Sequence, residues 1–204
     1  MSNRSFFYKT LSIYYRYRLS YYSANFGRQD KYSKDSGVVI RNFSKLIIHP
    51  NYNKLKRFDS DIALVKLNEK ISFTDKIQPA RLPNNDVNNL SNDAYCCVAG
   101  WGKTGGYGNE NALNQACIDY IDTITCNSSN IYNGHLTNNM FCAGFAEGGT
   151  DSCSGDSGGP LMCLESDWLL TGITSWGESC GTKPGVYTKV SNFYKWITSK
   201  ISTN

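Results

Sequence analysis

Residues 151–160 read Asp-Ser-Cys-Ser-Gly-Asp-Ser-Gly-Gly-Pro, with Ser157 between an aspartate and two glycines. Glycine adopts backbone angles that a Cβ atom forbids, so this segment can turn sharply and direct successive N–H groups the same way. Two such donors beside a serine hydroxyl would stabilise an oxyanion, which is often the largest contribution to acyl-transfer catalysis. The same residue types also make ordinary surface turns. Taken alone, the stretch leaves a catalytic loop and a plain turn open.

Length and charge limit the classes of protein. The 204 residues suffice for one large all-β unit or two small domains that share a cleft. No apolar run approaches the length of a membrane span. Residues 1–34 carry seven Lys/Arg against Asp30 alone, so the formal net charge of +4 leaves the remaining residues at −2. This distribution argues against a nucleic-acid-binding face on the body of the protein.

The cysteine content indicates an oxidising compartment. Eight cysteines, an even number, predict four disulfides. A zinc site is the competing interpretation, but no pair of Cys-x-x-Cys knuckles is present. Glycosylation sequons at Asn42, Asn89 and Asn127 fit a secreted protein, although such triplets also arise by chance. Residues 1–19 interrupt any apolar core with arginine and tyrosine, so we expect an extracellular protein whose signal peptide is not in this sequence.

Short apolar runs predict strands. Residues 37–50 contain two of them, 38–40 and 46–48, and 61–67 is a buried strand. Residues 84–94, rich in Asn and Asp, predict a linker. Short strands then recur between turn signals up to residue 190, which is typical of a barrel rather than of βαβ units.

The two ends of the chain have different patterns. Near the C-terminus, apolar residues at helical spacing follow Ser191, which we expect to be the N-cap of a helix over 191–202. Near the N-terminus, residues 11–19 alternate apolar and polar side chains with the period of a strand. We favour an edge strand or a disordered arm there; a membrane-binding segment fits the period less well, and a misassigned exon is also open.

One motif is misleading. Gly102-Lys103-Thr104 invites a phosphate-loop interpretation, but Cys97 occupies the position of the required first glycine. No helix is predicted after it, so a glycine-rich surface loop is expected.

Six stretches follow one another along the chain: Asp61–Leu67, Cys96–Gly102, Asn139–Gly144, Asp151–Pro160, Ser175–Gly177 and Pro184–Thr188. In this order they resemble the trypsin-like, chymotrypsin-fold serine proteases, and the resemblance covers roughly residues 22–202. It implies an all-β fold, two antiparallel Greek-key barrels of which the first is incomplete, with a C-terminal α-helix. It divides the chain into a non-family segment (1–21) and a protease domain (22–204). Within that domain it implies a remnant of the first barrel at 22–85, the second barrel at 95–190 and the helix at 191–202.

The resemblance assigns catalytic roles to two side chains. Ser157 would be the nucleophile and Asp61 the carboxylate that orients a histidine, while the N–H groups of Gly155 and Ser157 would form the oxyanion hole. A serine hydroxyl needs a neighbouring base at neutral pH, and the aspartate fixes the tautomer of that base. Asp61 could instead merely begin a strand, but an unpartnered acid beside an apolar run would be costly to bury.

The resemblance also implies a specificity pocket for arginine or lysine. Asp151 would lie at its base and pair with the cationic side chain of the substrate. Ser179 departs from the glycine usual in the family, and the segment from Cys180 to Pro184 is shorter than in trypsin. The other residues implied for the pocket are Ser152, Ser175, Trp176, Gly177 and Gly185.

The implied disulfides tie these parts together. Three pairs follow the family, and the fourth joins the remaining two cysteines, which the family's barrel places on adjacent strands. Cys153–Cys180 would link the nucleophile loop to the pocket wall. The four pairs are Cys96–Cys163, Cys126–Cys142, Cys153–Cys180 and Cys97–Cys117.

One expected element is missing from this sequence. Neither His49 nor His135 has the Ala-Ala-His-Cys context of the family's catalytic histidine, and we expect both to be surface residues. The family's Ile-Val-Gly-Gly terminus, which would pair with Asp156, is absent too. Loss of the base costs about 10⁶ in turnover, so the chain as written is expected to be inactive.

Two functions are therefore weighed: a secreted serine endopeptidase whose front is lost or misassigned, and a non-catalytic homologue that binds a partner through the inherited cleft. The resemblance implies a polypeptide substrate, protein inhibitors as partners and a monomer. It implies no cofactor, no metal ion, no nucleic acid and no membrane span.

Overall fold

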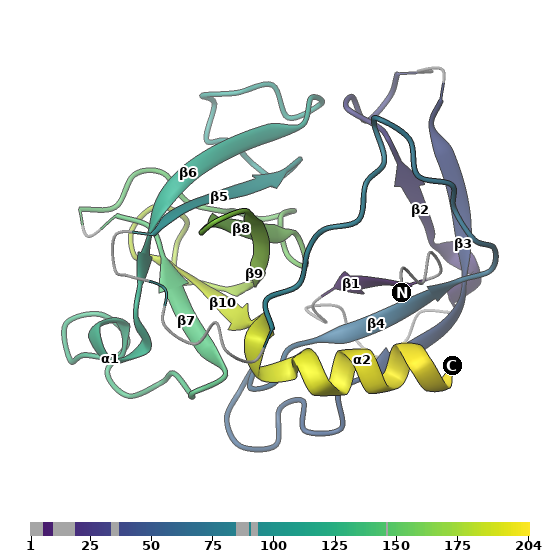
Figure 1. The fold of residues 1–204 in the computed structure, drawn as a ribbon. Coiled ribbons are helices and arrows are strands. Elements are labelled where there is room, and N and C mark those ends of the chain that lie inside the picture. The colour runs from purple at the N-terminus through teal and green to yellow at the C-terminus, as the bar shows by residue number, and fades with distance from the viewer. Residues whose placement is uncertain (1–5, 10–18, 34–36, 85–89, 91–93, 146) are drawn as a thin grey trace.

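The computed structural model describes residues 6–9, 19–33, 37–84, 90, 94–145 and 147–204, the first of these ranges by its backbone alone. A closed β-barrel and an open four-stranded sheet lie side by side, and helix α2 runs along one side of the sheet (Figure 1). The helices are η1 (Leu19–Tyr21), α1 (Thr123–Cys126), η2 (Val190–Phe193) and α2 (Tyr194–Thr203), and the strands are β1 (Phe6–Lys9), β2 (Ser23–Phe26), β3 (Val39–Ile48), β4 (Ala63–Leu67), β5 (Tyr95–Gly100), β6 (Asn114–Ile121), β7 (Met140–Ala143), β8 (Pro160–Leu164), β9 (Trp168–Trp176) and β10 (Gly185–Lys189).

The barrel closes in the order β10-β7-β6-β5-β8-β9, with each neighbouring pair antiparallel. Strand side chains alternate between faces, so β6 directs Ile118 and Tyr120 inward and Asp119 outward. The interior is apolar and lacks helical crossovers, which confirms the predicted barrel. Its core consists of Ala94, Cys96, Val98, Ile118, Tyr120, Phe141, Ala143, Leu161, Cys163 and Tyr187.

The first half of the chain forms an open sheet in the order β1-β4-β3-β2. The two apolar runs predicted between 37 and 50 belong to one strand, β3, because the polar residues between them lie on the same extended backbone. Strand β4 is almost entirely buried, as predicted, since Leu64 packs against residues of the second half. The all-β class with an incomplete first barrel is thereby confirmed.

The N-terminal segment contributes one edge strand. Backbone pairing runs antiparallel from Phe6 opposite Lys66 to Lys9 opposite Ala63, so β1 extends the sheet beyond β4. The alternating pattern that suggested a strand lies at residues 11–19, and residues 11–18 are outside the described part of the chain.

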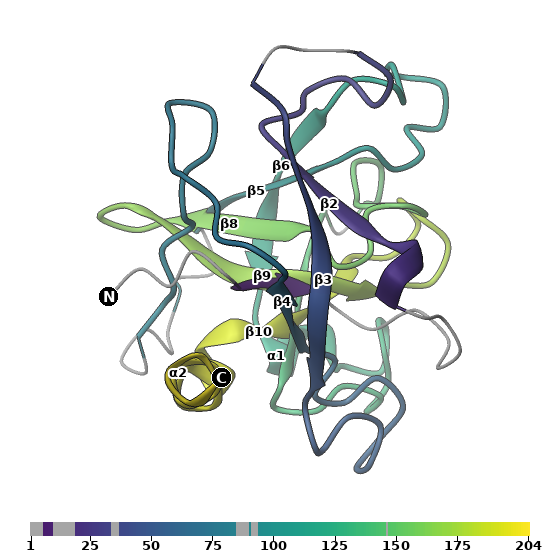
Figure 2. The ribbon, with the colours of Figure 1, turned by 90° about the vertical axis from the view of Figure 1, so that its right-hand side faces the viewer.

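The two halves contact each other at several backbone positions. The N–H of Leu113 donates to the carbonyl of Gln29 at 2.7 Å, and the N–H of Leu170 donates to the carbonyl of Arg81 at 2.8 Å. The second contact attaches Arg81, in the segment between β4 and β5, to β9. Figure 2, in which α2 is seen end-on, shows β3 and β4 passing in front of the barrel strands.

The C-terminal helix begins later than predicted. Ser191 lies inside the 3₁₀ turn η2, whose N-cap is Lys189, while the N-cap of α2 is Phe193. The predicted cap at Ser191 is therefore wrong: Ser191 is 4% exposed and its backbone has already begun to wind. The predicted apolar face is present, and fully buried Ile197 packs on the body of the protein.

Four disulfides join the described cysteines, and they are the same four pairs that the family resemblance implies: Cys96–Cys163, Cys97–Cys117, Cys126–Cys142 and Cys153–Cys180. Two of them bracket β5, since Cys96 faces Cys163 on β8 and Cys97 faces Cys117 on β6. Among the described residues, no helix has both the length and the apolar character needed to cross a bilayer.

The three sequons differ in their surroundings. Asn42 is exposed on β3. Asn127 is half-buried, and its side-chain amide bonds both the N–H (2.9 Å) and the carbonyl (3.4 Å) of Leu136, which closes the loop after α1. Asn89 lies outside the described residues.

The docking of α2 is testable with two substitutions on the same helix. Ile197→Ala should lower the free energy of unfolding by about 2–5 kcal/mol, because it leaves a cavity against the body of the protein. Exposed Lys195→Ala should change it by no more than about 0.5 kcal/mol. Urea titration followed by tryptophan fluorescence measures both; equal effects would contradict the packing described for Ile197.

Candidate active site

Strand β9 holds the Ser157 loop and Asp61 at consecutive positions. The N–H of Gly158 donates to the carbonyl of Thr174 at 2.9 Å, and the N–H of Thr174 donates to the carbonyl of Gly159 at 3.0 Å. The next residue, Ser175, donates its hydroxyl to Asp61 Oδ2 at 2.6 Å. Two residues almost a hundred positions apart in the chain are thus tied to the same end of one strand.

Asp61 is completely buried. An ionised carboxylate is expensive to bury without partners, and the Ser175 hydroxyl is one such partner. The Thr188 hydroxyl also donates to the backbone carbonyl of Asp61 at 2.8 Å. Both donors come from the barrel, so docking of the barrel against the sheet helps to hold Asp61 in place.

The segment before Asp61 contains a buried acid that the sequence interpretation missed. Asp59 is 3% exposed, and its carboxylate accepts hydrogen bonds from Ser60 Oγ (2.9 Å), Thr137 Oγ1 (2.5 Å) and Asn139 Nδ2 (3.1 Å). Phe58 and Ser60, on either side, have positive φ of 62° and 54°. Such strained backbone persists only where surrounding contacts enforce it. The only signal in the sequence was a second aspartate two residues before Asp61.

The serine loop is held by the carboxylate of Asp156. Its Oδ1 accepts from the N–H of Gly102 at 2.8 Å and its Oδ2 from the N–H of Cys153 at 3.0 Å. Gly155 has a φ of +106°, and a Cβ there would lie 3.0 Å from the Cα of Gly102. Within the part of the chain that the structure describes, the N–H groups of Gly155 and Ser157 donate to no protein acceptor.

Asp151 lies beside the residues implied for the pocket. Its carboxylate accepts from the N–H of Ser152 (2.7 Å) and of Gly181 (3.3 Å). A Cβ on Gly185 would come within 2.6 Å of Asp151 Oδ1, so only glycine leaves the carboxylate accessible there. Burial raises the pKa of Asp151 above its ordinary value of 3.8, partly offset by these hydrogen bonds. The hydroxyl of Tyr187 donates to Ser152 Oγ at 3.0 Å.

Aromatic side chains lie next to Gly177 and Gly185, the two glycines predicted to line the pocket. Trp176 pairs with Val186 across β9 and β10. The Trp176 ring stacks on Phe58, with centroids 6.1 Å apart, and meets the ring of Tyr132 edge-on at 4.9 Å. Tyr132 donates to the carbonyl of Pro184 at 2.8 Å, and burial raises its pKa to about 12. The Trp176 ring is thus packed between Phe58 and Tyr132, and Tyr132 is itself held by its bond to Pro184.

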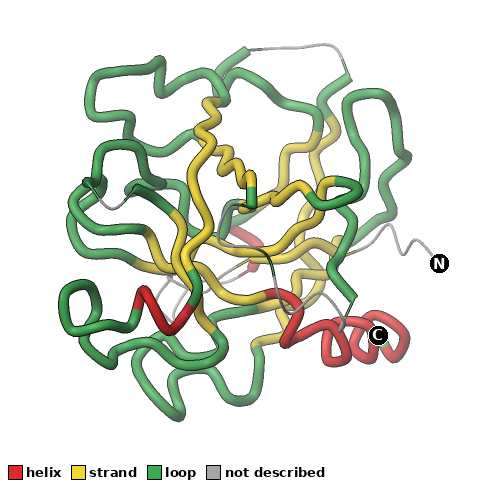
Figure 3. Tube along the Cα trace, turned by 60° about the vertical axis from the view of Figure 1, so that its left-hand side comes forward, coloured by secondary structure: helices red, strands yellow, loops and turns green. Residues whose placement is uncertain are grey.

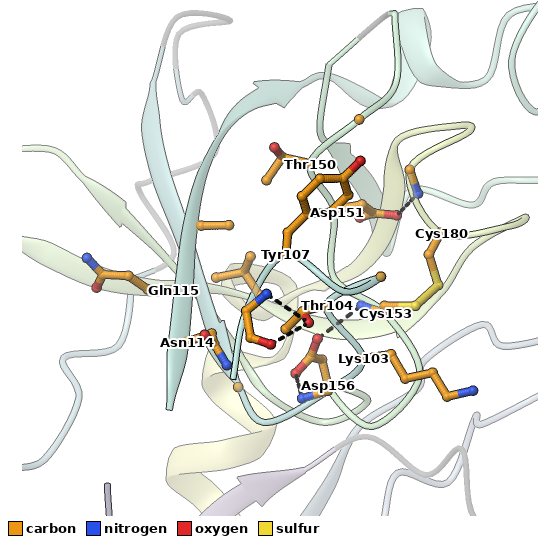
Figure 4. Close-up of a pocket in the computed structure, with 18 residues that line it drawn as sticks. Lys103, Thr104, Tyr107, Asn114, Gln115, Thr150, Asp151, Cys153, Asp156 and Cys180 are labelled. Atoms are coloured by element: carbon orange, nitrogen blue, oxygen red, sulfur yellow. Dashed lines mark hydrogen bonds between the residues drawn. A yellow bond between two sulfur atoms is a disulfide. The ribbon is translucent and has the colours of Figure 1, made fainter. Parts of the chain in front are cut away.

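A cavity of about 630 Å³ lies beside Asp151 and is lined largely by residues 98–108, 114–116, 149–156 and 180–181 (Figure 4). Gly102-Lys103-Thr104 forms part of its lining as a loop, as predicted. The predicted walls Ser175–Gly177 and Gly185 do not line this cavity; of the residues predicted for substrate binding, Asp151 does. The labelled lining residues in Figure 4 are Lys103, Thr104, Tyr107, Asn114, Gln115, Thr150, Asp151, Cys153, Asp156 and Cys180.

Ser179 has a φ of +52°, in the left-handed region that favours glycine. It precedes Cys180, whose disulfide to Cys153 joins this loop to the serine loop. The departure from glycine noted in the sequence therefore imposes backbone strain beside the pocket. Ser179 and Cys180 are both exposed; many of the loops, green in Figure 3, lie on the outside of the molecule.

The two histidines lie in different surroundings. The ring of His49 packs edge-on against Phe193 (5.0 Å) and Trp196 (4.9 Å), the aromatic residues around the start of α2. It is half-buried rather than a plain surface residue, and burial lowers its pKa, with a smaller opposing effect from Asp59. His135 is exposed on the loop before β7. In the described part of the chain, no three His, Cys, Asp or Glu side chains form a group that could hold a metal ion.

A β-barrel in which one strand bonds both a glycine-rich serine loop and a buried aspartate is the arrangement of a trypsin-like serine protease fold. The trypsin family model matches residues 17–197, so the match begins ahead of residue 22. The chain is 43% identical to trypsin-3 of Salmo salar over 164 residues, which cover 78% of this chain and 65% of that protein. It is 42% identical to cationic trypsin-3 of Rattus norvegicus over 174 residues, 83% of this chain and 67% of that protein.

A third relative is trypsin of Xenopus laevis, 43% identical over 162 residues, which cover 78% of this chain and 64% of that protein. The chain belongs to the trypsin family. It spans about two thirds of the length of these relatives.

The raised pKa of Asp151 predicts a pH dependence. Its favourable contribution to folding is present below 3.8 and is lost as the pH rises through the raised folded pKa. The unfolding free energy of Asp151→Asn relative to the unsubstituted protein should therefore increase between pH 3 and pH 7. Urea titrations at several pH values measure it.

Asp167 is the matched control, because hydrogen bonding to Arg81 lowers its pKa. Asp167→Asn should show the opposite trend with pH. The same trend in both variants would contradict burial as the cause of the Asp151 shift.

Ser179→Gly is expected to stabilise the fold by about 1 kcal/mol, because glycine adopts the left-handed conformation without the cost that a Cβ imposes. Thermal unfolding measures the change. Ser166→Gly, at an exposed position with no positive φ, should be neutral or destabilising; stabilisation by that variant as well would contradict local strain at Ser179.

Proposed function

We propose that the protein is a secreted serine endopeptidase that cleaves polypeptides after arginine or lysine. Membership of the trypsin family supports the reaction class. The four disulfides support an extracellular location. The observation that carries the proposal is the attachment of the Ser157 loop and Asp61 to consecutive residues of β9.

Each site residue has a chemical role in the proposal. The Ser157 hydroxyl attacks the scissile carbonyl, and the N–H groups of Gly155 and Ser157 stabilise the resulting oxyanion. Asp61 orients the base that accepts the serine proton and stabilises it when charged. Asp156 holds the turn that directs the two N–H groups, through its bonds to Gly102 and Cys153.

Asp151 is the proposed determinant of cleavage after a basic residue. A partly buried carboxylate is destabilised in its charged form, as the raised pKa indicates, and a bound guanidinium or ammonium group would compensate for the missing solvation. Glycine at 177 and 185 adds no side chain beside Asp151, and a Cβ on Gly185 would meet Asp151 Oδ1 at 2.6 Å. Ser152, Ser175 and Trp176 complete the proposed wall.

We also propose that these 204 residues by themselves bind substrate without turning it over. The ring of His49 packs at the start of α2 and His135 is exposed on a loop, which supports the proposal that neither acts as the base for Ser157. A non-catalytic homologue that binds a basic peptide through the same pocket is the second candidate, and this position of the two histidines favours it.

Binding of 4-aminobenzamidine, a planar amidinium that fluoresces in apolar sites, tests the pocket. The unsubstituted chain should bind it, and Asp151→Asn and Gly185→Ala should each weaken binding at least tenfold, because the first removes the carboxylate charge and the second places a methyl group against Asp151. Asp167→Asn is the control for loss of an acid elsewhere. Absence of binding, or unchanged binding in both pocket variants, would rule out the proposed pocket.

Hydrolysis separates the two candidates. Cleavage of an arginine ester by the unsubstituted protein, and its loss in the Ser157→Ala variant, would support the endopeptidase. Binding of 4-aminobenzamidine without ester cleavage would support the binding module.

A further inference from the structure

The connection between β3 and β4 carries an exposed basic segment next to the proposed pocket. Lys54, Lys56 and Arg57 are all exposed, and Leu55 between them is 73% exposed. In Figure 1 this connection projects below the body of the molecule. An exposed basic run is most often only a solvated loop, so its relation to the neighbouring aromatic wall decides whether it has a role.

Arg57 lies directly on that wall. Its guanidinium carbon is 4.7 Å from the ring centroid of Phe58, and Phe58 stacks on Trp176. A cation over an aromatic face is held in place by the ring quadrupole while its N–H groups stay available to other acceptors. The Arg57 charge is therefore held over Phe58, next to Trp176 and the proposed glycine-lined pocket.

No acidic side chain among the described residues forms an ion pair with Arg57. Within the described residues, ion pairs join Arg41 to Glu69, Arg81 to Asp167 and Lys183 to Glu178, and none includes Arg57. Glu178, the carboxylate next to the pocket wall, is neutralised by Lys183 at 2.6 Å. Asp59 is buried with three hydrogen-bond donors, and Lys56 donates to the carbonyl of Gly134.

The dimensions fit an extended peptide. A strand advances about 3.3 Å per residue, so the 6.1 Å between the Trp176 and Phe58 rings corresponds to about two residues. A peptide with its basic side chain at Asp151 and its carbonyl at Ser157 would run along Ser175–Gly177 in one direction. In that pose, the side chains two to four residues before the basic one would reach Phe58 and Arg57.

From these observations we infer that Arg57, seated on the ring of Phe58, is a specificity-determining residue that favours substrates with Asp or Glu shortly before the arginine or lysine at the cleavage site. The inference rests on the proposed function, because it needs the basic residue to bind at Asp151. It narrows the substrate class to basic sites preceded by acidic residues.

The test is displacement of 4-aminobenzamidine by short peptides from the Ser157→Ala chain, which prevents hydrolysis. Acetyl-Glu-Glu-Gly-Arg-amide is compared with acetyl-Gln-Gln-Gly-Arg-amide at 50 mM NaCl. We expect the glutamate peptide to bind about two- to fivefold more tightly, the range of exposed ion pairs. The advantage should shrink at 0.5 M NaCl, because salt screens exposed charges.

Two variants assign the effect to Arg57. Arg57→Gln should bring the ratio of the two affinities close to one, while Lys195→Gln, a loss of the same charge on exposed α2, should leave the ratio unchanged. Acetyl-Gly-Arg-Glu-Glu-amide, with the acids after the arginine, should gain nothing over its glutamine counterpart.

The outcomes separate the inference from the function on which it rests. If 4-aminobenzamidine does not bind, the pocket itself is refuted. If it binds but the glutamate and glutamine peptides displace it equally, only the acidic preference is overturned. A preference that survives in Arg57→Gln, or that disappears equally in Lys195→Gln, would refute the role of Arg57.

Discussion

The hydrogen bond from the Ser175 hydroxyl to the buried Asp61 carboxylate is the constraint on which the site depends. Asp61 precedes β4 of the open sheet, whereas Ser175 lies on β9 of the barrel. Because a buried carboxylate is costly without donors, the stable arrangement of Asp61 requires that the two halves dock. The same docking places the Ser157 loop, which pairs with the residue next to Ser175.

Four buried or half-buried acids lie in this region, each with different partners. Asp61 and Asp59 receive hydroxyl and amide donors from the barrel side, so they connect the halves. Asp156 receives two backbone N–H groups and shapes a loop. Asp151 has a raised pKa despite its two backbone donors, which leaves part of its charge uncompensated. This incomplete compensation is why we propose Asp151, rather than the other acids, as the partner of a cationic ligand.

Local patterns predicted much of the fold because they depend on neighbouring residues. Apolar runs marked β3 and β4, and the spacing around Ile197 marked α2. The predicted N-cap at Ser191 was wrong because a 3₁₀ turn already begins at Val190. Val190, Ser191 and Phe193 of that turn are buried against the body of the protein, which no local pattern indicated. Two predicted strands became one because the sheet pairs the intervening residues too.

Residue types and their order were enough to predict the all-β class, the glycine-rich loop around Ser157 and a carboxylate at position 151 six residues before the serine. Three other features became visible in the folded chain: Asp59 is buried between the two halves, His49 packs on α2 and Arg57 lies over Phe58. Such contacts join residues far apart in the chain or depend on strained backbone. Their free energies come from packing and desolvation that no local pattern contains.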